Sequence, residues 1–284
     1  MYPDKFLLPL YRNILHLSLG RGEQTLAKID ALIFNLQRKT VIHCNKNISI
    51  LLPPDPHFFR YLIKSHEQHV SNAISNLAKD GDVVVDVGAN IGYFSAYAAA
   101  AVGKFGQVFC LEPEAKNFEY LKANCDLIQR SGFNCSAFQL AASSVSGQAT
   151  LNIHRYSTYH AIEDEQHNLD KVENKQLIKT VTLDEWSQSQ ALTNISLLKI
   201  DTEGHEPKVL EGARQLFEAR AIDFVILECR SDYLANFIDE FCKEFSLNQL
   251  VWDGQDWHQT TLQSLAYKTE CLLSKEPISP TLLC

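Results

Sequence analysis

The sequence lacks three features: an excess of basic residues, a long uninterrupted apolar run, and cysteines at metal-binding spacing. Its 26 Lys and Arg residues face 34 Asp and Glu residues, which gives a net charge of -8. Nucleic-acid binding needs a basic face for the phosphate backbone, so the composition argues against nucleic acid as a partner. The length of 284 residues fits one large domain or a domain with an extension.

No apolar run is long enough for a signal peptide or a membrane span. The most apolar part of the N-terminus, residues 6–19, is interrupted by Pro9, Arg12 and His16, whereas a spanning helix needs about 20 consecutive apolar residues. The pattern favours an amphipathic helix packed on the domain, and a helix lying on a membrane surface is the alternative. We therefore expect no stable membrane insertion.

The eight cysteines include no C-x-x-C pair, so the common zinc and redox motifs are absent. Cys110 and Cys229 fall in predicted buried strands, where a thiol acts as a small apolar group. We expect a reducing, cytoplasmic setting and no bound metal.

Strands and helices alternate regularly from residue 83 onward. Apolar runs predict strands over 83–87, 107–111, 135–141, 195–200, 224–227, 247–252 and 266–273, and helical spacing predicts helices over 92–102, 115–130, 206–219 and 233–245. Such alternation predicts an α/β fold with a doubly wound, mainly parallel sheet. Residues 1–64 are predicted to form a helical and short-strand extension, and the segment 156–178 shows the least pattern of all.

In a parallel sheet, right-handed crossovers place the carboxyl ends of all strands at one edge. We call this edge the rim. The chain is expected to bring together there five residues that are distant in sequence: Asp86, Glu112, Ala142, Asp201 and Glu228.

A glycine-spaced turn, Gly88-x-Asn90-x-Gly92, follows the strand 83–87. In open α/β sheets such a loop holds a nucleotide-like ligand. A dinucleotide motif has glycines at its first, third and sixth positions, but here the third and sixth are Asn90 and Tyr93. The loop therefore fits a nucleoside ligand without a pyrophosphate better than it fits NAD. A plain strand-to-helix turn is the alternative.

Two acids accompany this loop. Glu112 lies about 20 residues beyond it, at the end of the second strand, where an acid accepts hydrogen bonds from ribose hydroxyls. Asp86 lies inside the first apolar run, where a carboxylate is costly unless it is paired. The ammonium and sulfonium groups of S-adenosylmethionine are suitable partners, and the N–H groups of the loop are the alternative.

A cluster of polar residues follows the predicted strand 195–200. It consists of Asp201, Glu203, His205 and Glu206, all within one turn. We interpret Asp201 and Glu203 as functional because ligands bind at this edge of open α/β sheets. His205 is a candidate general base, since imidazole titrates near neutral pH. Glu206 opens a predicted helix, where an acid favours the helix dipole.

Taken in order and spacing, these motifs resemble the FkbM-type family of S-adenosylmethionine-dependent methyltransferases. The matching segments are 86–92 (DVGANIG), 112–113 (EP), 181–184 (VTLD) and 199–206 (KIDTEGHE). Glu67 and the segment 51–56 also resemble the part that this family carries ahead of its first strand. The resemblance implies a class I methyltransferase fold, Rossmann-like, over residues 65–284. It also implies O-methylation of a hydroxyl on a sugar, a glycolipid or a secondary metabolite, with a small molecule or glycan as acceptor.

The resemblance further implies roles for individual residues. For the cofactor S-adenosyl-L-methionine these are Asp86, Gly88, Asn90 and Gly92 in the loop, Glu112 at the ribose, Ala142 at the adenine and Glu67 at the methionine end. Asp201 and Glu203 match the family's second signature and, with His205, are the predicted catalytic residues of a direct in-line methyl transfer. Two alternatives are an NAD-type oxidoreductase, which Asn90 and Tyr93 disfavour, and a non-catalytic protein that binds S-adenosylmethionine.

Overall fold

The computed structural model describes residues 40–44, 48–53, 58, 61, 66–154, 161–162, 172–262 and 269–283. The chain divides into two compact units, residues 1–42 with 51–66 and residues 43–50 with 67–284. All the predicted site residues belong to the second unit. The helices predicted within residues 1–40 lie outside the described residues, and the predicted division after residue 64 stays a prediction.

Within the described residues, the second unit is built on an eight-stranded sheet with the order β13-β12-β14-β11-β10-β3-β4-β5. Five neighbouring strands are parallel: β11 (Ile222–Cys229), β10 (Ile195–Ile200), β3 (Val83–Val87), β4 (Gln107–Leu111) and β5 (Cys135–Phe138). The other three pair antiparallel: β14 (Thr269–Ser274), β12 (Asn248–Trp252) and β13 (Trp257–His258). The predicted mainly parallel sheet is confirmed.

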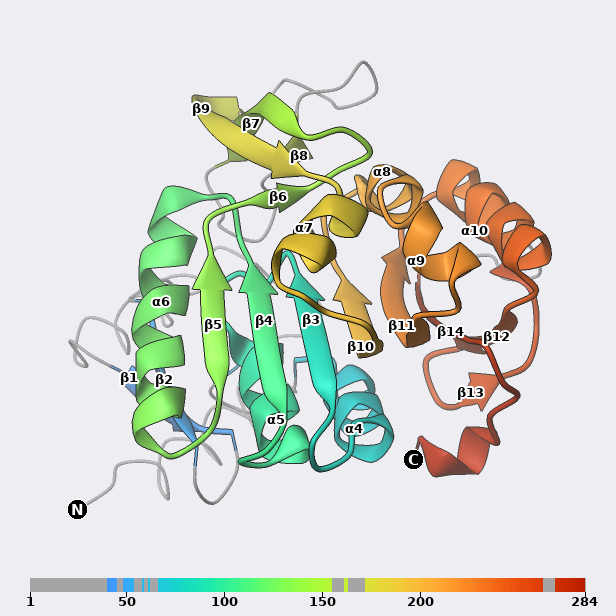
Figure 1. The fold of residues 1–284 in the computed structure, drawn as a ribbon, viewed down its shortest axis with the longest axis horizontal. Helices are drawn as coiled ribbons and strands as arrows, with labels where there is room; N and C mark the ends of the chain where they lie inside the picture. Colours follow the sequence, from blue (N-terminus) through green and yellow to red (C-terminus); the bar gives the residue numbers. More distant parts are fainter. Residues whose placement is uncertain are drawn as a thin grey trace, which may run out of the picture. The chain divides into compact units, whose positions relative to one another are not determined.

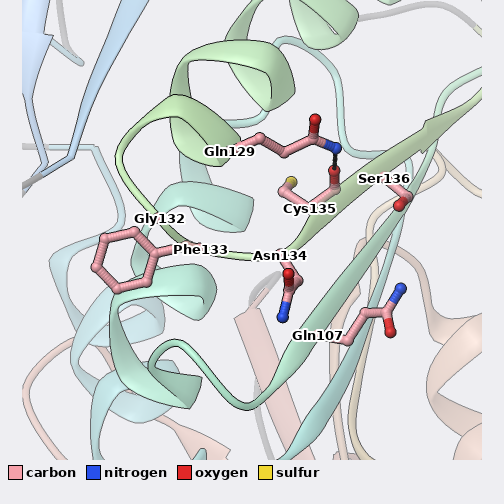
Figure 2. A pocket seen from close by; sticks show the side chains of 7 residues that line it. All are labelled: Gln107, Gln129, Gly132, Phe133, Asn134, Cys135 and Ser136. Carbon is pink, nitrogen blue, oxygen red and sulfur yellow. Dashed lines mark hydrogen bonds between the residues drawn. The ribbon is translucent and has the colours of Figure 1, made fainter.

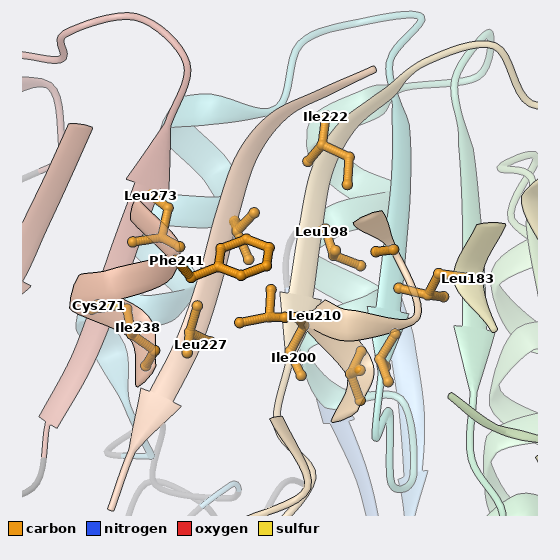
Figure 3. Packing of buried hydrophobic residues seen from close by; sticks show 14 of the residues in the cluster. Leu183, Leu198, Ile200, Leu210, Ile222, Leu227, Ile238, Phe241, Cys271 and Leu273 are labelled. Atoms are coloured by element: carbon orange, nitrogen blue, oxygen red, sulfur yellow. The ribbon is translucent and has the colours of Figure 1, made fainter. Parts of the chain in front are cut away.

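Helices cover both faces of this sheet (Figure 1). One face carries α4 (Gln68–Leu77), α5 (Tyr93–Val102) and α6 (Ala115–Arg130), and the other carries α7 (Leu183–Ser189), α8 (Glu206–Glu211), α9 (Arg214–Glu218) and α10 (Asp232–Phe245). On the second face Leu198, Ile200 and Leu227 pack against Leu210 and Phe241 (Figure 3). Successive strand residues point to opposite faces, so each apolar strand contributes to both cores.

The helices begin where the sequence supplies a capping group. Glu114, Thr182 and Ser231 each accept a hydrogen bond from the backbone N–H three positions on, at 2.6, 3.2 and 3.2 Å. These bonds satisfy donors that the first turn of a helix leaves open. The helix predicted over 115–130 is confirmed as α6, with the same bounds.

Two predicted elements are divided. The helix expected over 206–219 breaks into α8 and α9 around Gly212, where an added Cβ would lie 2.1 Å from the backbone oxygen of Ser143. The chain therefore turns where two backbones approach closely. The strand expected over 135–141 ends at Phe138, and after two further residues β6 (Ala141–Ala142) begins in a different sheet.

That second sheet has the order β6-β9-β7-β8 in the described residues, with β7 (Gly147–His154), β8 (Ala161–Ile162) and β9 (Val172–Val181). In Figure 1 it lies beyond the arrowheads of β3, β4 and β5, at the rim. The Gln176 side chain ties it there, donating to Pro113 O at 2.9 Å and accepting from Ala115 N at 3.1 Å. Most side chains of β9 are partly or fully exposed, which explains why the segment 156–178 shows little apolar pattern.

Three shorter features complete the described chain. β1 (Thr40–His43) and β2 (Ser49–Leu52) form a two-stranded sheet, and a 3-10 helix, η4, spans Pro280–Leu282. Among the described residues, no helix is both long and apolar enough to cross a membrane.

Replacing Gly88 with alanine tests how tightly the glycine loop packs on the turn after β10. An added Cβ would lie 1.9 Å from the backbone oxygen of Asp201, whereas one at Gly81 would meet nothing within 4 Å; the φ angles are +74° and +90°. Gly81→Ala thus measures the backbone strain alone, about 1–2 kcal/mol. We expect Gly88→Ala to lower the free energy of unfolding, measured in urea, by about 1–3 kcal/mol more than Gly81→Ala does. Equal losses would contradict this packing.

Candidate functional site

The glycine loop is held at the rim by bonds to its two neighbours. Gly88 N and Ala89 N donate to Leu111 O at 2.9 and 3.0 Å, which ties the loop to the end of β4. Asn90 and Gly92 have φ angles of 52° and 85°, in the left-handed region. A non-glycine residue in this region is uncommon and often marks a functional loop. The predicted loop residues are therefore brought together in a fixed, sharply turned backbone.

Glu112 closes this loop from the side of β4. Its Oε2 accepts from Asn90 N at 2.8 Å, and its Oε1 accepts from Glu114 N at 2.9 Å. Burial raises the pKa of Glu112 to about 8, although the two backbone donors act in the opposite direction. Each carboxylate oxygen has a second lone pair, so Glu112 retains acceptor capacity for the predicted ribose hydroxyls.

Asp86 has a partner that the sequence reasoning did not identify. Lys199 Nζ lies 3.7 Å from Asp86 Oδ1, and Ser95 Oγ donates to Asp86 Oδ2 at 2.6 Å. The expected partners were a ligand cation or the N–H groups of the loop. Burial still raises the pKa of Asp86 to about 6, and Oδ1 accepts no hydrogen bond from the described residues. The missed signal is a single lysine inside the apolar run 195–200.

Lys199 is the buried cation at the centre of the site. Its Nζ lies 3.3 Å from Asp201 Oδ2 and 4.8 Å from the centre of the Phe94 ring. Burial opposes the charge of Lys199, but Asp201, Asp86 and Glu67 outweigh it and raise its pKa. The pairing follows from register, because Lys199 stands opposite Asp86 across β10 and β3. Asp201, two residues further on, returns to the same side of the chain.

The turn after β10 is built around Glu206. Its Oε1 accepts from Thr202 N at 2.8 Å, from Thr202 Oγ1 at 3.0 Å and from Gly204 N at 3.2 Å. These bonds confirm the predicted structural role of Glu206. Within the turn, Glu203 adopts a left-handed φ of 57°.

Arg230 connects this turn to the end of β11. Its guanidinium pairs with Glu203, and its Nε lies 2.5 Å from Glu228 Oε2. β11 runs one residue past Glu228, which was expected to follow the strand. Burial raises the pKa of Glu228, and the carboxyl groups of Asp201 and Glu67 raise it further. Arg230 thus fixes two rim carboxylates, and the sequence reasoning missed it.

Two predicted residues lie on the β5 side of the rim. The Ser143 hydroxyl and His205 Nε2 are 3.0 Å apart, so His205 is placed beside the residue that follows β6. Ala142 is buried and belongs to the core, and its place beside the adenine stays a prediction.

Glu67 reaches the rim from the start of α4. It has a left-handed φ of 39° and precedes the first residue of the helix. Burial raises the pKa of Glu67, and the carboxyl groups of Asp201 and Glu270 add to this effect. The predicted cofactor residue Glu67 is therefore close to the predicted catalytic residue Asp201.

The rim is strongly acidic as a whole. Eight carboxyl groups gather around Lys199 and Arg230: Glu67, Asp86, Glu112, Asp201, Glu203, Glu206, Glu228 and Glu270. Carboxylates so close together, and partly shielded from water, disfavour one another's charge. The arrangement is suited to a ligand that brings positive charge.

Two other features lie away from the rim. A cavity of about 520 Å³ is lined by Gln107, Gln129, Gly132, Phe133, Asn134, Cys135 and Ser136, at the start of β4 and β5 (Figure 2). Among the described residues, Cys110, Cys125 and Cys135 are the group whose ligand atoms lie close enough to share a metal ion. The seven described cysteines are free thiols. The cavity lies at the opposite ends of the strands from the predicted site. The cysteine group was not predicted as part of that site, although Cys110 stands opposite Asp86 across β4 and β3.

The fold and the rim together define a class I methyltransferase domain. Comparison with protein families identifies which one: the Methyltransferase FkbM domain matches residues 86–248. The chain belongs to this family of methyltransferases.

The chain is also similar to one curated relative and to solved structures. The hexuronic acid methyltransferase AglP of Haloferax volcanii is 29% identical over 170 residues, 57% of this chain and 62% of that protein. The chain thus matches less than two thirds of that relative's length. A methyltransferase FkbM from Methylobacillus flagellatus has a TM-score of 0.47 at 16% identity, covering 77% of this chain and 53% of that one. An S-adenosylmethionine-dependent O-methyltransferase from Thermotoga maritima has a TM-score of 0.41 at 14% identity, and the match covers 75% of this chain and 66% of that one.

Replacing Lys199 with methionine tests its role as counterion. Without the lysine charge the pKa of Asp86 rises further. The native state then keeps a proton on Asp86 that the unfolded chain releases. The free energy of unfolding therefore falls as pH rises from 5 toward 8. We expect Lys199→Met to lower the free energy of unfolding by about 3–5 kcal/mol at pH 8 and by less at pH 5.

The matched control for this change is Lys208→Met. Lys208 is half exposed and pairs with Glu211 within one helix, so its loss should cost at most about 1 kcal/mol at either pH. Denaturant unfolding at both pH values measures the difference. A Lys199→Met loss that does not depend on pH would contradict the counterion role.

Proposed function

We propose that this protein transfers the methyl group of S-adenosyl-L-methionine to a hydroxyl group of a sugar. The observation that carries the proposal is the acid-rich rim beside the glycine loop. Family membership supports methyl transfer, and it weighs against the NAD-type oxidoreductase and the non-catalytic binding protein that the sequence left open.

The residues of the rim fit this cofactor. Asp86 offers a buried oxygen, Oδ1, that no described residue bonds, and Glu112 retains acceptor capacity for the ribose. Glu67 and Asp201 supply negative charge near Lys199, where a ligand ammonium or sulfonium would relieve the repulsion. We assign Asp86, Gly88, Asn90 and Glu112 to the nucleoside side, and Glu67 to the methionine side.

When bound, the cofactor supplies an electrophilic methyl group on a sulfonium. The chain's own task is to hold the acceptor hydroxyl in line with that methyl, since alignment contributes up to about 7–11 kcal/mol to such reactions. The Arg230 pairs with Glu203 and Glu228 give the rim a fixed wall on the β11 side. A hydroxyl acceptor must also lose its proton near the transition state.

The sugar acceptor is supported by the relative named a hexuronic acid methyltransferase, which is similar over 57% of this chain. Carboxylates are also the common partners of sugar hydroxyls, because each oxygen accepts hydrogen bonds in several directions. The rim holds such groups in Glu203, Glu228 and Glu270.

Transfer of radiolabelled methyl tests the proposal. Purified protein and labelled S-adenosylmethionine are incubated with p-nitrophenyl glycosides of neutral hexoses and hexuronic acids, and with glycans extracted from the host. We expect label in an acid-stable methyl ether of a sugar. Label in protein, nucleic acid or lipid alone would contradict the sugar acceptor, and no transfer at all would contradict the proposed activity.

Proton release on binding tests whether the carboxyl groups receive a cationic ligand. The pKa values of about 6 for Asp86 and about 7 for Glu67 lie above the ordinary range. A bound cation lowers them, so binding releases protons near pH 7 and the affinity rises with pH between 6 and 8.

Calorimetry in phosphate and in Tris buffer measures the number of protons released. S-adenosylhomocysteine is the matched control because it lacks the sulfonium charge, and we expect it to release fewer protons. Equal release for the two ligands would contradict a role of these acids in receiving the sulfonium.

A further inference from the structure

A second group of side chains lies at the rim on the side of β12, and the proposed function has not yet used it. His69 Nε2 is 2.7 Å from Glu270 Oε2, and the two side chains keep 15% and 14% of their surface exposed. The His69 ring stacks on Trp252, with ring centres 4.5 Å apart and planes 4° apart. The imidazole is therefore fixed both in position and in orientation.

The fold explains why these residues meet. Glu270 stands opposite Glu228 across β14 and β11, and Trp252 follows Val251, which pairs with the neighbour of Glu270. Helix α4 places His69 above them, two residues after Glu67. The buried Trp257 contacts both rings, at 6.1 Å from His69 and 5.7 Å from Trp252. Four segments of the chain thus converge on one imidazole.

This group is next to the predicted methionine side of the cofactor site. Glu67 interacts electrostatically with His69 and Glu270, and also with Asp201 and Lys199. It therefore interacts with charged residues of both groups. An acceptor that approaches the methyl group from β11 and β12 would meet the exposed part of His69.

We propose that His69, oriented by Glu270, takes the proton of the acceptor hydroxyl during methyl transfer. This inference rests on the proposed function. Glu270 Oε2 lies beside Nε2 although the two form no aligned hydrogen bond, so the carboxylate acts by its charge. It stabilises the imidazolium that forms when the other ring nitrogen accepts a proton. Because Nε2 faces Glu270, the accepting atom is Nδ1.

The step balances without a further reactant. The acceptor oxygen forms a bond to the methyl carbon, the carbon–sulfur bond breaks, and its electron pair stays on sulfur as S-adenosylhomocysteine. The hydroxyl proton moves to His69 Nδ1. The resulting imidazolium is stabilised by Glu270 and then loses its proton to solvent at the exposed edge.

The three residues predicted as catalytic are placed less favourably for this task. Asp201 pairs with Lys199, and Glu203 pairs with Arg230. His205 contacts Ser143, on the β5 side of the rim where the adenine is predicted to bind. We infer that Asp201 and Glu203 shape the site, and that proton transfer belongs to His69.

His69→Gln tests the proposal, because glutamine keeps a donor for Glu270 and a flat group for Trp252 but cannot take up a proton. The assay is labelled methyl transfer into the p-nitrophenyl glycosides and host glycans. We expect kcat to fall about 10²–10⁴-fold, with an unchanged Kd for S-adenosylhomocysteine. Glu270→Gln should lower kcat about 10–100-fold, as expected for a group that orients the base.

The chain offers a matched control in His258→Gln. His258 Nε2 lies 2.8 Å from Asp253 Oδ2, so it forms the same kind of pair near the same strands, but it is 54% exposed. We expect wild-type kcat for this variant. Free imidazole should restore part of the activity of His69→Ala, which a packing role would not allow.

The pH profile gives a further measurement. Among the described residues, Glu270 on β14 and Glu67, which precedes α4, are the charged groups that interact with His69, while Trp252 and Trp257 are uncharged. We expect the acid limb of kcat/KM in the wild type to disappear in His69→Gln and to persist in His258→Gln.

The outcomes separate this inference from the proposed function. Wild-type protein that transfers methyl while His69→Gln keeps its kcat would overturn the role of His69 alone. A loss of kcat with no rescue by imidazole and an unchanged pH profile would assign His69 to packing and also overturn it. Absence of transfer by the wild type would overturn the proposed function and this inference together.

Discussion

The site depends on one buried lysine among carboxylates. Lys199 meets Asp86 and Asp201, which come from adjacent strands, and its charge is kept in spite of burial. A buried charge is costly unless it is paired, so these groups constrain one another. The pairing in turn holds the ends of β3 and β10 together, where Gly88 packs on the backbone of Asp201. The glycine loop and the turn after β10 are therefore one packed unit and not two independent loops.

The lysine does not balance the charge of the rim. Lys199 and Arg230 stand among eight carboxyl groups, and burial raises the pKa values of Asp86, Glu112, Glu67 and Glu228. The protein without ligand thus keeps protons on groups that would ionise in water. A ligand with a sulfonium and an ammonium replaces those protons with fixed positive charge. This is a physical reason for the site to prefer S-adenosylmethionine over an anionic dinucleotide, independent of the glycine pattern that first disfavoured NAD.

Much of the fold follows from local sequence, whereas the contacts within the site do not. The parallel strands and α6 are encoded in apolar runs and helical spacing, which a short window of sequence contains. Strand β9 was missed because its exposed side chains leave little apolar pattern, and the break at Gly212 depends on a backbone contact with Ser143. Likewise the pairs of Lys199 with Asp86 and of His69 with Glu270 join residues more than a hundred positions apart. A sequence pattern can show that Asp86 needs a partner, but only the strand register identifies which residue it is.

The two sides of the rim differ in how they relate to the family. The FkbM domain match spans residues 86–248, which includes the glycine loop, Glu112 and the turn after β10. His69, Trp252, Trp257 and Glu270 lie outside that range, on α4 and on the antiparallel strands. The match therefore includes the glycine loop and the buried Lys199 with its partners Asp86 and Asp201, while Glu67 and the residues around His69 lie beyond it. Because His69 and Glu270 lie on elements that do not carry Lys199, the proposed acceptor side can change without disturbing the buried Lys199 and its carboxylates.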